Sequence, residues 1–442
     1  MGKNKEDTHY EVVVIGGGVT GTAILYTLAK YTNVKSIALL ERYKTLAAVQ
    51  SAKDNNSQTL HFGDIETNYT LEKAGYVKEG AEMVRRYVEE HSEKKLFRKF
   101  HKMVLAVGNE EVAALRERHK AFKKLFPQLK LLEREQIQQK EPKLVKARGN
   151  VPICAMYSEE GYAVDFGALA KSFGKEATAN DKDISIRCST RVTAIQRTKR
   201  GYMIVTDTNV FHAKTVIVAA SANSLTFAHK LGYRKDLILL PVAGDFFRSR
   251  KLLNGKVYMM QHPKLPFAAI HGDPDVGNPE EVRFGPIAKV IPLLEKGNYR
   301  SFIDFMRLFN FKFSHIVCLL RIISDPIYYR YVFWNVLYEM PFFGKYIFAR
   351  EVRKIIPSIR GSDLQHGRKL GGIRPQVVDT TTGKMALGEA SIVGKDILFN
   401  ITPSPGASVC LQNAEKNVKQ LIEFLGKGYT FDQKGFDAHF RK

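Results

Sequence analysis

Three glycines near the amino terminus have the spacing of a loop that binds phosphate. Gly16, Gly18 and Gly21 stand in G-x-G-x-x-G register, with Val19 and Thr20 between the last two. The first glycine permits a tight turn, the second lets backbone approach a pyrophosphate, and the third allows a helix to pack closely on a strand. A helix that begins here would direct its free N–H groups at the phosphates. The spacing therefore predicts a dinucleotide site.

The elements around these glycines fit such a site. The apolar run at 12–15 is typical of a buried parallel strand, 22–30 indicates a helix, and 36–42 indicates a second strand. Glu41 follows the last glycine by about 20 residues, where a carboxylate can accept hydrogen bonds from an adenosine ribose. Because no second G-x-G-x-x-G occurs, we expect one bound dinucleotide. The amino-terminal position and the following segment favour FAD, with a small molecule or a diffusing carrier as the other redox partner.

The composition is that of a globular protein with a basic surface. Of 442 residues, 44% are hydrophobic and 26% are charged, which argues against general disorder. The net charge of +23 is compatible with nucleic acid, an anionic membrane surface, acidic metabolites, or simply a basic proteome. The four cysteines lie far apart and lack metal-ligand spacing, so we expect no metal site. The polar beginning lacks the apolar run of a signal peptide, which favours the cytoplasm.

The order of elements predicts two interleaved domains. Amphipathic helices around a strand at 95–107 follow the dinucleotide unit, a β-rich stretch with a turn at 197–201 comes next, and Asp165 is a plausible helix cap. We expect an α/β fold, with a Rossmann-type FAD-binding domain and an interleaved substrate domain built on a mostly antiparallel sheet. The FAD-binding domain is predicted to comprise 1–75, 147–235 and 366–442. The substrate and membrane-contact domain is predicted to comprise 76–146 and 236–365.

Several segments along the chain resemble a known group of flavoproteins. The glycine motif together with "GYAVDFGALA", "TVIVAASANSL", "PFAAIHGD", "RFGP", "GGIRPQ" and "NITPSPGAS" resembles the D-amino-acid-oxidase-like superfamily. Within it, "SQTLHFGDIETNYT" and "ITPSPGASVCL" are most similar to the FAD-dependent malate:quinone oxidoreductases. L-2-hydroxyglutarate dehydrogenases share a related histidine segment and a similar proline-rich loop. Ser221 departs from the pattern, since many such flavoproteins have glycine there.

The resemblance implies an enzyme that oxidises L-malate to oxaloacetate and passes electrons through FAD to a quinone, in the tricarboxylic acid cycle. It also implies a peripheral enzyme on the cytoplasmic side of the cell membrane. Two alternatives stay open: a flavin dehydrogenase for L-2-hydroxyglutarate or another 2-hydroxy acid, and, prompted by the net charge, a flavin-bearing RNA-binding protein. The basic residues form no nucleic-acid motif that we recognise, so we expect no nucleic-acid partner.

Oxidation of a 2-hydroxy acid needs a base for the hydroxyl proton and cations for the carboxylates. We expect His271, at the end of an apolar strand, to be the base, and His61 to be an alternative base or a substrate donor. Arg374 in "GGIRPQ" is expected to clamp a carboxylate, with Arg283 as a second candidate. The competing interpretation for His271 is a core histidine held by backbone groups.

Two polar segments are expected to meet the flavin. The stretch 55–70 would lie over the isoalloxazine ring, with Gln58, Thr59 and Tyr69 bonding the substrate or the flavin edge. The loop 403–408 before the last helix would present N–H groups to the flavin N1–C2=O edge. The residues predicted to bind the cofactor are Gly16, Gly18, Val19, Thr20, Gly21, Glu41, Ser57, Gln58, Val192, Gly372, Pro405, Gly406, Ala407 and Ser408.

The segment 299–354 is both aromatic and basic, as suits a helix that lies at a membrane interface. It is interrupted by charges too often for a transmembrane span, which needs about 20 nearly uninterrupted apolar residues. The alternative is a helical core of the substrate domain with a basic rim. The residues concerned are Phe302, Phe305, Phe309, Phe311, Phe313, Tyr328, Tyr329, Tyr331, Phe333, Trp334, Arg307, Lys312, Arg321, Arg330, Lys345, Arg350, Arg353 and Lys354.

Overall fold

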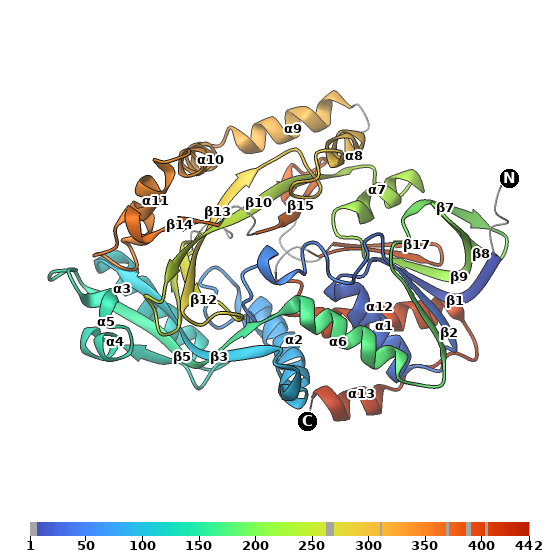
Figure 1. Ribbon diagram of the computed structural model, residues 1–442, viewed down its shortest axis with the longest axis horizontal. Coiled ribbons are helices and arrows are strands. Elements are labelled where there is room, and N and C mark those ends of the chain that lie inside the picture. Colours follow the sequence, from blue (N-terminus) through green and yellow to red (C-terminus); the bar gives the residue numbers. More distant parts are fainter. Residues whose placement is uncertain are drawn as a thin grey trace.

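Two β-sheets packed side by side form the framework of the protein in a computed structural model (Figure 1). The structure describes residues 7–261, 269–309, 312–367, 371–385, 390–402 and 405–441, without the side chains of Asp7 and Lys94. In the first sheet β1 pairs in parallel with β2 and β9, and the parallel pairing continues to β6 on one side and β18 on the other. Strands β7, β8 and β17 add antiparallel edges. The strands are β1 (Asp7–Ile15), β2 (Ser36–Leu40), β6 (Asp183–Arg187), β7 (Val192–Thr198), β8 (Gly201–Thr206), β9 (Val210–Val218), β17 (Ala390–Gly394) and β18 (Ile397–Ile401).

The centre of the first sheet is buried on both faces. Val12 and Val14 pack under α1, whereas Val13 and Ile15 pack into a second core on the opposite face, because side chains alternate along a strand. Helices α6 and α12 flank α1, and α2 packs on α12. The Asp165 carboxylate caps α6 by accepting a hydrogen bond from the Ala168 N–H, as predicted. The helices are α1 (Val19–Tyr31), α2 (Leu71–Glu90), α6 (Phe166–Thr178), α7 (Asn223–Lys230), α12 (Cys410–Leu425) and α13 (Gln433–Phe440).

The second sheet follows the order β16-β15-β10-β13-β12-β11-β3-β5-β4, with β14 on β10. Its pairs are antiparallel except for β11 with β3, so the sheet is mostly antiparallel, as predicted. The strands are β3 (Phe97–Val107), β4 (Lys130–Leu132), β5 (Ile153–Val164), β10 (Leu237–Arg250), β11 (Lys256–Met259), β12 (His271–Pro274), β13 (Glu281–Val290), β14 (Gln365–His366), β15 (Ile373–Asp379) and β16 (Lys384–Met385).

Strand membership crosses two of the boundaries predicted from the sequence. β5 lies within the predicted FAD-binding range 147–235 but pairs with β3 and β4 of the second sheet. β15 and β16 lie within the predicted range 366–442 but extend the second sheet from β10. An apolar strand pattern shows that a strand is buried but not which sheet it joins, because pairing depends on residues far away in the sequence.

A row of helices lies along the outer side of the second sheet (Figure 1). We call α8–α11 the helical arm. No helix in the described ranges is long and apolar enough to cross a membrane. The arm and the remaining short helices are α8 (Ser301–Leu308), α9 (Phe313–Ile323), α10 (Pro326–Tyr338), α11 (Gly344–Val352), α3 (Asn109–Phe122), α4 (Arg134–Lys140), α5 (Pro142–Val145), η1 (Lys53–Asn55), η2 (Ser92–Lys94) and η3 (Gly361–Asp363).

Candidate active site

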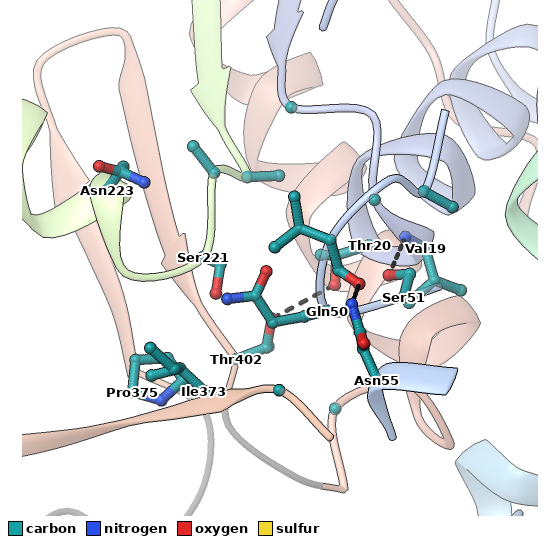
Figure 2. Close-up of a pocket in the computed structure, with 18 of the residues that line it drawn as sticks. Val19, Thr20, Gln50, Ser51, Asn55, Ser221, Asn223, Ile373, Pro375 and Thr402 are labelled. Atoms are coloured by element: carbon teal, nitrogen blue, oxygen red, sulfur yellow. Dashed lines mark hydrogen bonds between the residues drawn. The ribbon is translucent and has the colours of Figure 1, made fainter. Parts of the chain in front are cut away.

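A cavity of about 520 Å³ runs from the ends of the parallel strands to the second sheet. Segments far apart in the sequence meet in it: the start of α1, the loop at 47–59, and the residues that follow β9 and β18. Figure 2 shows this meeting, with Thr20, Gln50, Ser221 and Thr402 facing one another. The place is the one expected for a ligand of a doubly wound sheet, outside the carboxyl ends of its strands.

The glycine loop forms one end of the cavity and has no room for side chains. Gly16 has a φ of +113°, and a Cβ there would lie 2.5 Å from the Ala219 carbonyl oxygen. A Cβ on Gly21 would lie 1.9 Å from the Gly16 carbonyl oxygen, so Gly21 serves the packing of α1 on the turn rather than the cavity wall. Gly18 starts α1 without a side-chain cap, which leaves helix N–H groups for an anion.

The carboxylate of Glu41 holds the loop after β2 beside this turn. Its Oε2 accepts a hydrogen bond from the Gly17 N–H at 2.6 Å, and its Oε1 accepts one from the Tyr43 N–H at 2.9 Å. Each carboxylate oxygen has more than one acceptor site, so Glu41, which lines the cavity, can still accept from a ribose hydroxyl. A glycine turn, an uncapped helix start and a strand-end acid together fit the adenosine diphosphate half of FAD.

The loop at 47–59 closes over the helix start. The Ser51 Oγ accepts a hydrogen bond from the Val19 N–H at 2.9 Å, and the Asn55 amide donates to the Val49 carbonyl at 2.8 Å (Figure 2). On the far side, a Cβ on Gly372 would lie 2.6 Å from the Asn55 carbonyl oxygen. Backbone thus approaches backbone closely at both ends of the cavity.

His271 lies at the start of β12, buried in the cavity wall. Its Nδ1 is 2.7 Å from the Asp273 Oδ2, and its ring stacks on Tyr258 with the ring centroids 4.7 Å apart. Its partner is therefore a carboxylate, not the backbone that the competing interpretation supposes. Burial alone would raise the pKa of Asp273, but Lys256 and His271 hold it well below the ordinary value.

His61 has a similar arrangement on another wall. Its Nδ1 lies 2.5 Å from the Oε1 of buried Glu66, and its backbone N–H donates to the Ser408 Oγ at 2.9 Å. Burial would raise the pKa of Glu66, but His61 and Lys102 keep it below the ordinary value, so the carboxylate is ionised. The cavity therefore has two imidazoles, each oriented by a buried carboxylate.

Arg374 on β15 lines the cavity and has no carboxylate within ion-pair distance in the described part of the chain. The titratable groups near it among the described residues are the phenols of Tyr69 and Tyr331, whose pKa values burial raises, so that both are neutral; desolvation lowers the pKa of Arg374. Arg374 is partly buried, and a partly desolvated guanidinium with five donors favours an anion from outside the chain as its partner. Arg374 is thus a ready site for a carboxylate.

Most of the predicted site residues line this cavity, and four do not. Tyr69 lies behind Arg374 rather than in the wall, and Gly21 lies under the turn. The Gln58 amide is used inside the protein, where its Oε1 accepts from the Val276 N–H at 2.8 Å. The predicted residues in the cavity wall are Gly16, Gly18, Val19, Thr20, Glu41, Ser57, Thr59, His61, Val192, His271, Gly372, Arg374, Pro405, Gly406, Ala407 and Ser408.

Arg283 is also turned away from the cavity wall. It forms ion pairs with Asp275 and with Asp54, the second at 2.9 Å, and its side chain is 1% exposed. Because Arg283 does not line the cavity, it cannot reach a substrate bound there, and its Nη2 is held by the two aspartates. The structure therefore assigns Gln58 and Arg283 to the support of the 53–58 loop. The first two residues of the predicted loop 403–408 lie outside the described residues.

The sequence reasoning missed the residues behind the two histidines. Asp273 follows His271 by two positions on a strand, so their side chains share a face, and this spacing could have been noticed. Lys256 and Tyr258 follow the same alternation on β11. Glu66 has no comparable signal, because the segment from His61 to Glu66 is irregular backbone.

The fold and the cavity define a flavin-dependent oxidoreductase. The profile of the family described as "FAD dependent oxidoreductase" matches residues 11–306. A solved L-alpha-glycerophosphate oxidase from Mycoplasma pneumoniae with FAD bound superposes with a TM-score of 0.63 at 18% identity, covering 93% of this chain and 94% of that one. At that identity the likeness shows the fold alone. The cofactor of this chain is FAD.

Curated relatives identify the family of the chain more narrowly. It is 41% identical to a probable malate:quinone oxidoreductase of Campylobacter jejuni, covering 96% of this chain and 98% of the relative. It is 36% identical to the malate:quinone oxidoreductase of Helicobacter pylori, with 96% of each chain covered. The L-2-hydroxyglutarate dehydrogenase of Bos taurus is 26% identical over 86% of this chain and 80% of that one. The chain belongs to the malate:quinone oxidoreductase family of FAD-dependent oxidoreductases.

Proposed function

We propose that this enzyme oxidises L-malate to oxaloacetate and that the electrons pass through FAD to a quinone. The observation that carries the choice of substrate class is the Arg374 guanidinium, which has no carboxylate partner among the described residues and lies in the same cavity as His271. A bidentate pair between arginine and carboxylate fixes both the position and the orientation of an acid. FAD supplies the hydride acceptor when bound.

The residues of the chain divide the remaining work. Arg374 binds a carboxylate, and its partial burial in the cavity wall reduces the competition of water with the pair. His271 takes the hydroxyl proton at Nε2, because its Nδ1 faces Asp273. His61, oriented by Glu66, donates to the second carboxylate or to the carbonyl oxygen that forms. The loop before α12 holds the flavin edge through the N–H groups around Gly406.

An acceptor and substrate screen of the purified protein tests this function. We expect a yellow protein whose bound flavin is bleached anaerobically by L-malate and reoxidised by a soluble quinone analogue, without reduction of NAD. L-2-Hydroxyglutarate is the matched competitor, because it carries the same 2-hydroxy acid and one further carbon. A higher kcat/KM for the five-carbon acid would assign the enzyme to the alternative activity. A colourless protein that takes up no flavin would contradict both.

We also propose that the helical arm rests on an anionic membrane surface. Its aromatic side chains are only partly buried: Phe305 and Phe309 are in the core, but Phe313 is 78% exposed and Phe342 is 86% exposed. Basic residues interleave with them, and Phe311 lies outside the described residues. Asp304 and Arg307 of α8 also line the cavity, so the arm reaches from the surface to the site and offers a lipid-soluble quinone a short route.

Sedimentation with lipid vesicles tests the arm. The holoenzyme should sediment with phosphatidylglycerol vesicles more than with phosphatidylcholine vesicles, and binding should weaken in salt. The double variant Phe313→Asp/Phe342→Asp should stay in the supernatant and keep activity with a soluble quinone analogue. Val393→Asp on β17, an exposed apolar position away from the arm, is the control and should sediment normally. Equal sedimentation of all three proteins would remove the arm from the membrane contact, and salt-sensitive RNA binding instead would support the nucleic-acid alternative.

A further inference from the structure

A buried cluster of charged groups lies behind His271, away from the cavity. Asp273 is 2% exposed and Lys256 is 0% exposed. The Lys256 Nζ is 3.3 Å from the Asp273 Oδ1, and the Tyr258 hydroxyl donates to the same oxygen at 3.0 Å. His271 lines the cavity wall, but Asp273, Lys256 and Tyr258 do not. These three residues can therefore act on a substrate only through His271.

The cluster is closed by Thr59, which does reach the cavity wall. Its Oγ1 accepts a hydrogen bond from the Lys256 Nζ at 3.0 Å and lies 2.7 Å from the Tyr258 hydroxyl. The Tyr258 ring also covers one face of the imidazole. Asp273 and Tyr258 therefore contact His271, and Thr59 holds Tyr258 and Lys256 in place. Because Nδ1 faces Asp273, Nε2 is the ring nitrogen left for the cavity that His271 lines.

A buried ion pair in a sheet core needs a reason, because an apolar pair of similar volume is usually at least as stable. Burial would raise the pKa of Asp273, and the nearby Lys256 and His271 reverse this and lower it. Burial lowers the pKa of Lys256, and Asp273 opposes this. The carboxylate is thus anionic and already balanced by the lysine. A balanced carboxylate can orient an imidazole without drawing a proton onto it.

We propose that Asp273, neutralised by Lys256, is a positioning residue that fixes the Nδ1–H tautomer of His271, and that Lys256 balances the carboxylate so that the ring can accept a proton at Nε2. The inference rests on the proposed function, in which His271 is the base. In the reaction the substrate O–H bond breaks as Nε2–H forms, while the C2–H bond breaks as hydride leaves for oxidised FAD and the C=O bond forms. The positive charge of Lys256 then favours release of the proton from the ring.

The contact between the His271 ring and the Asp273 carboxylate can still become an aligned hydrogen bond. His271 Nδ1 and Asp273 Oδ2 are in contact but not aligned for a straight hydrogen bond, which a small rotation of the ring would complete. The charged or titratable groups around the ring from the neighbouring strands are Asp273 on β12, Lys256 and Tyr258 on β11, and Arg283 on β13, which is held by Asp275. Phe246 on β10 adds an uncharged contact.

Single substitutions of Lys256 and of Asp273 should shift the titration midpoint of His271 in opposite directions. Lys256→Met leaves Asp273 unbalanced, so the imidazolium becomes more stable and the titration midpoint of His271 rises by about one pH unit. Asp273→Asn removes the anion and lowers the midpoint by a similar amount. The midpoint is read from the ring 13C signals of the histidine-labelled holoenzyme, with the His271 signal assigned by its loss in His271→Gln. The acid limb of anaerobic flavin reduction by L-malate should move with it.

Two further variants separate a charge effect from damage to the fold. Lys102→Met removes an equally buried lysine from the adjacent strand β3 and should shift the His271 midpoint less than Lys256→Met does, because its ion-pair partner is Asp64 at 2.8 Å and not Asp273. The double variant Asp273→Asn/Lys256→Met buries no unpaired charge, so it should fold, restore the midpoint and still reduce the flavin more slowly because orientation is lost.

The outcomes are distinct for the inference and for the function. Midpoints that stay put, or move in the same direction in both single variants, overturn the positioning role even if L-malate reduces the flavin. Opposite shifts in a protein that no 2-hydroxy acid reduces would uphold the arrangement of the ring and overturn the proposed activity instead. A double variant that reduces the flavin at the parental rate would show that orientation by Asp273 contributes nothing.

Discussion

Arg283 and Arg374 lie on the same sheet, but Arg283 is buried and Arg374 is partly exposed in the cavity wall. Arg283 is held between two aspartates, whereas Arg374 has no carboxylate partner in the described ranges. If the role of Arg374 is to bind a carboxylate of the substrate, Arg374→Met should lower the activity without unfolding the enzyme. A charged bidentate contact contributes about 3 kcal/mol, so kcat/KM for L-malate should fall roughly 100-fold.

The same substitution should leave the protein without substrate at least as stable as before. Methionine fills the space of the arginine stem and removes a partly buried charge that has no carboxylate partner among the described residues. We therefore expect an unchanged or higher Tm for Arg374→Met, and loss of the rise in Tm that oxaloacetate gives the parent, since ligand binding stabilises the folded state by mass action. Thermal unfolding followed by flavin fluorescence, with and without oxaloacetate, measures both.

Arg283→Met is the matched control. This substitution leaves the carboxylate of Asp275 without its ion-pair partner, and breaking a buried pair in this way costs about 3–5 kcal/mol of folding free energy. This variant should lose several degrees in Tm and any activity in proportion to unfolding. If Arg374→Met were the less stable of the two, or if it still bound oxaloacetate as tightly as the parent, Arg374 would be a structural arginine and the clamp would have to lie elsewhere.

Three other perturbations follow from the same structure. His271→Gln should lower the rate of flavin reduction by about 10²–10⁴-fold with little change in substrate affinity, by stopped-flow absorbance; a parental rate would move the base to His61. Gly16→Ala should purify with much less flavin by its visible absorbance, because its Cβ meets the Ala219 carbonyl, whereas Gly108→Ala, with the same kind of positive φ and open space, should keep it. Burial would raise the pKa of Glu339, but His366 and Lys289 lower it to about 2, so this carboxylate stabilises the fold above its ordinary pKa of 4.5 and the contribution is lost as pH falls towards 2. Acid unfolding of Glu339→Gln should accordingly be less steep between these limits, and an identical curve would contradict the contribution.

The sequence by itself determined the local units. Val12 to Gly21 is a strand, a turn and a helix start because a continuous apolar run favours a buried strand, and glycine permits the positive φ and the close packing that the turn requires. The cap at Asp165, the hairpin of β7 and β8 and the helical character of the arm follow from equally local patterns. These features depend on neighbours within a few residues, which a single chain displays directly.

Only the tertiary structure decided which polar residues were already satisfied. Arg283 and Arg374 look alike in the sequence, but Asp54 and Asp275 reach the first and no described carboxylate reaches the second. Gln58 is used by Val276, a residue more than 200 positions away, and Lys256 meets Asp273 only because β11 and β12 pair. Ion pairs and hydrogen bonds act over a few ångströms, so their partners are set by the packing of strands and not by distance along the chain.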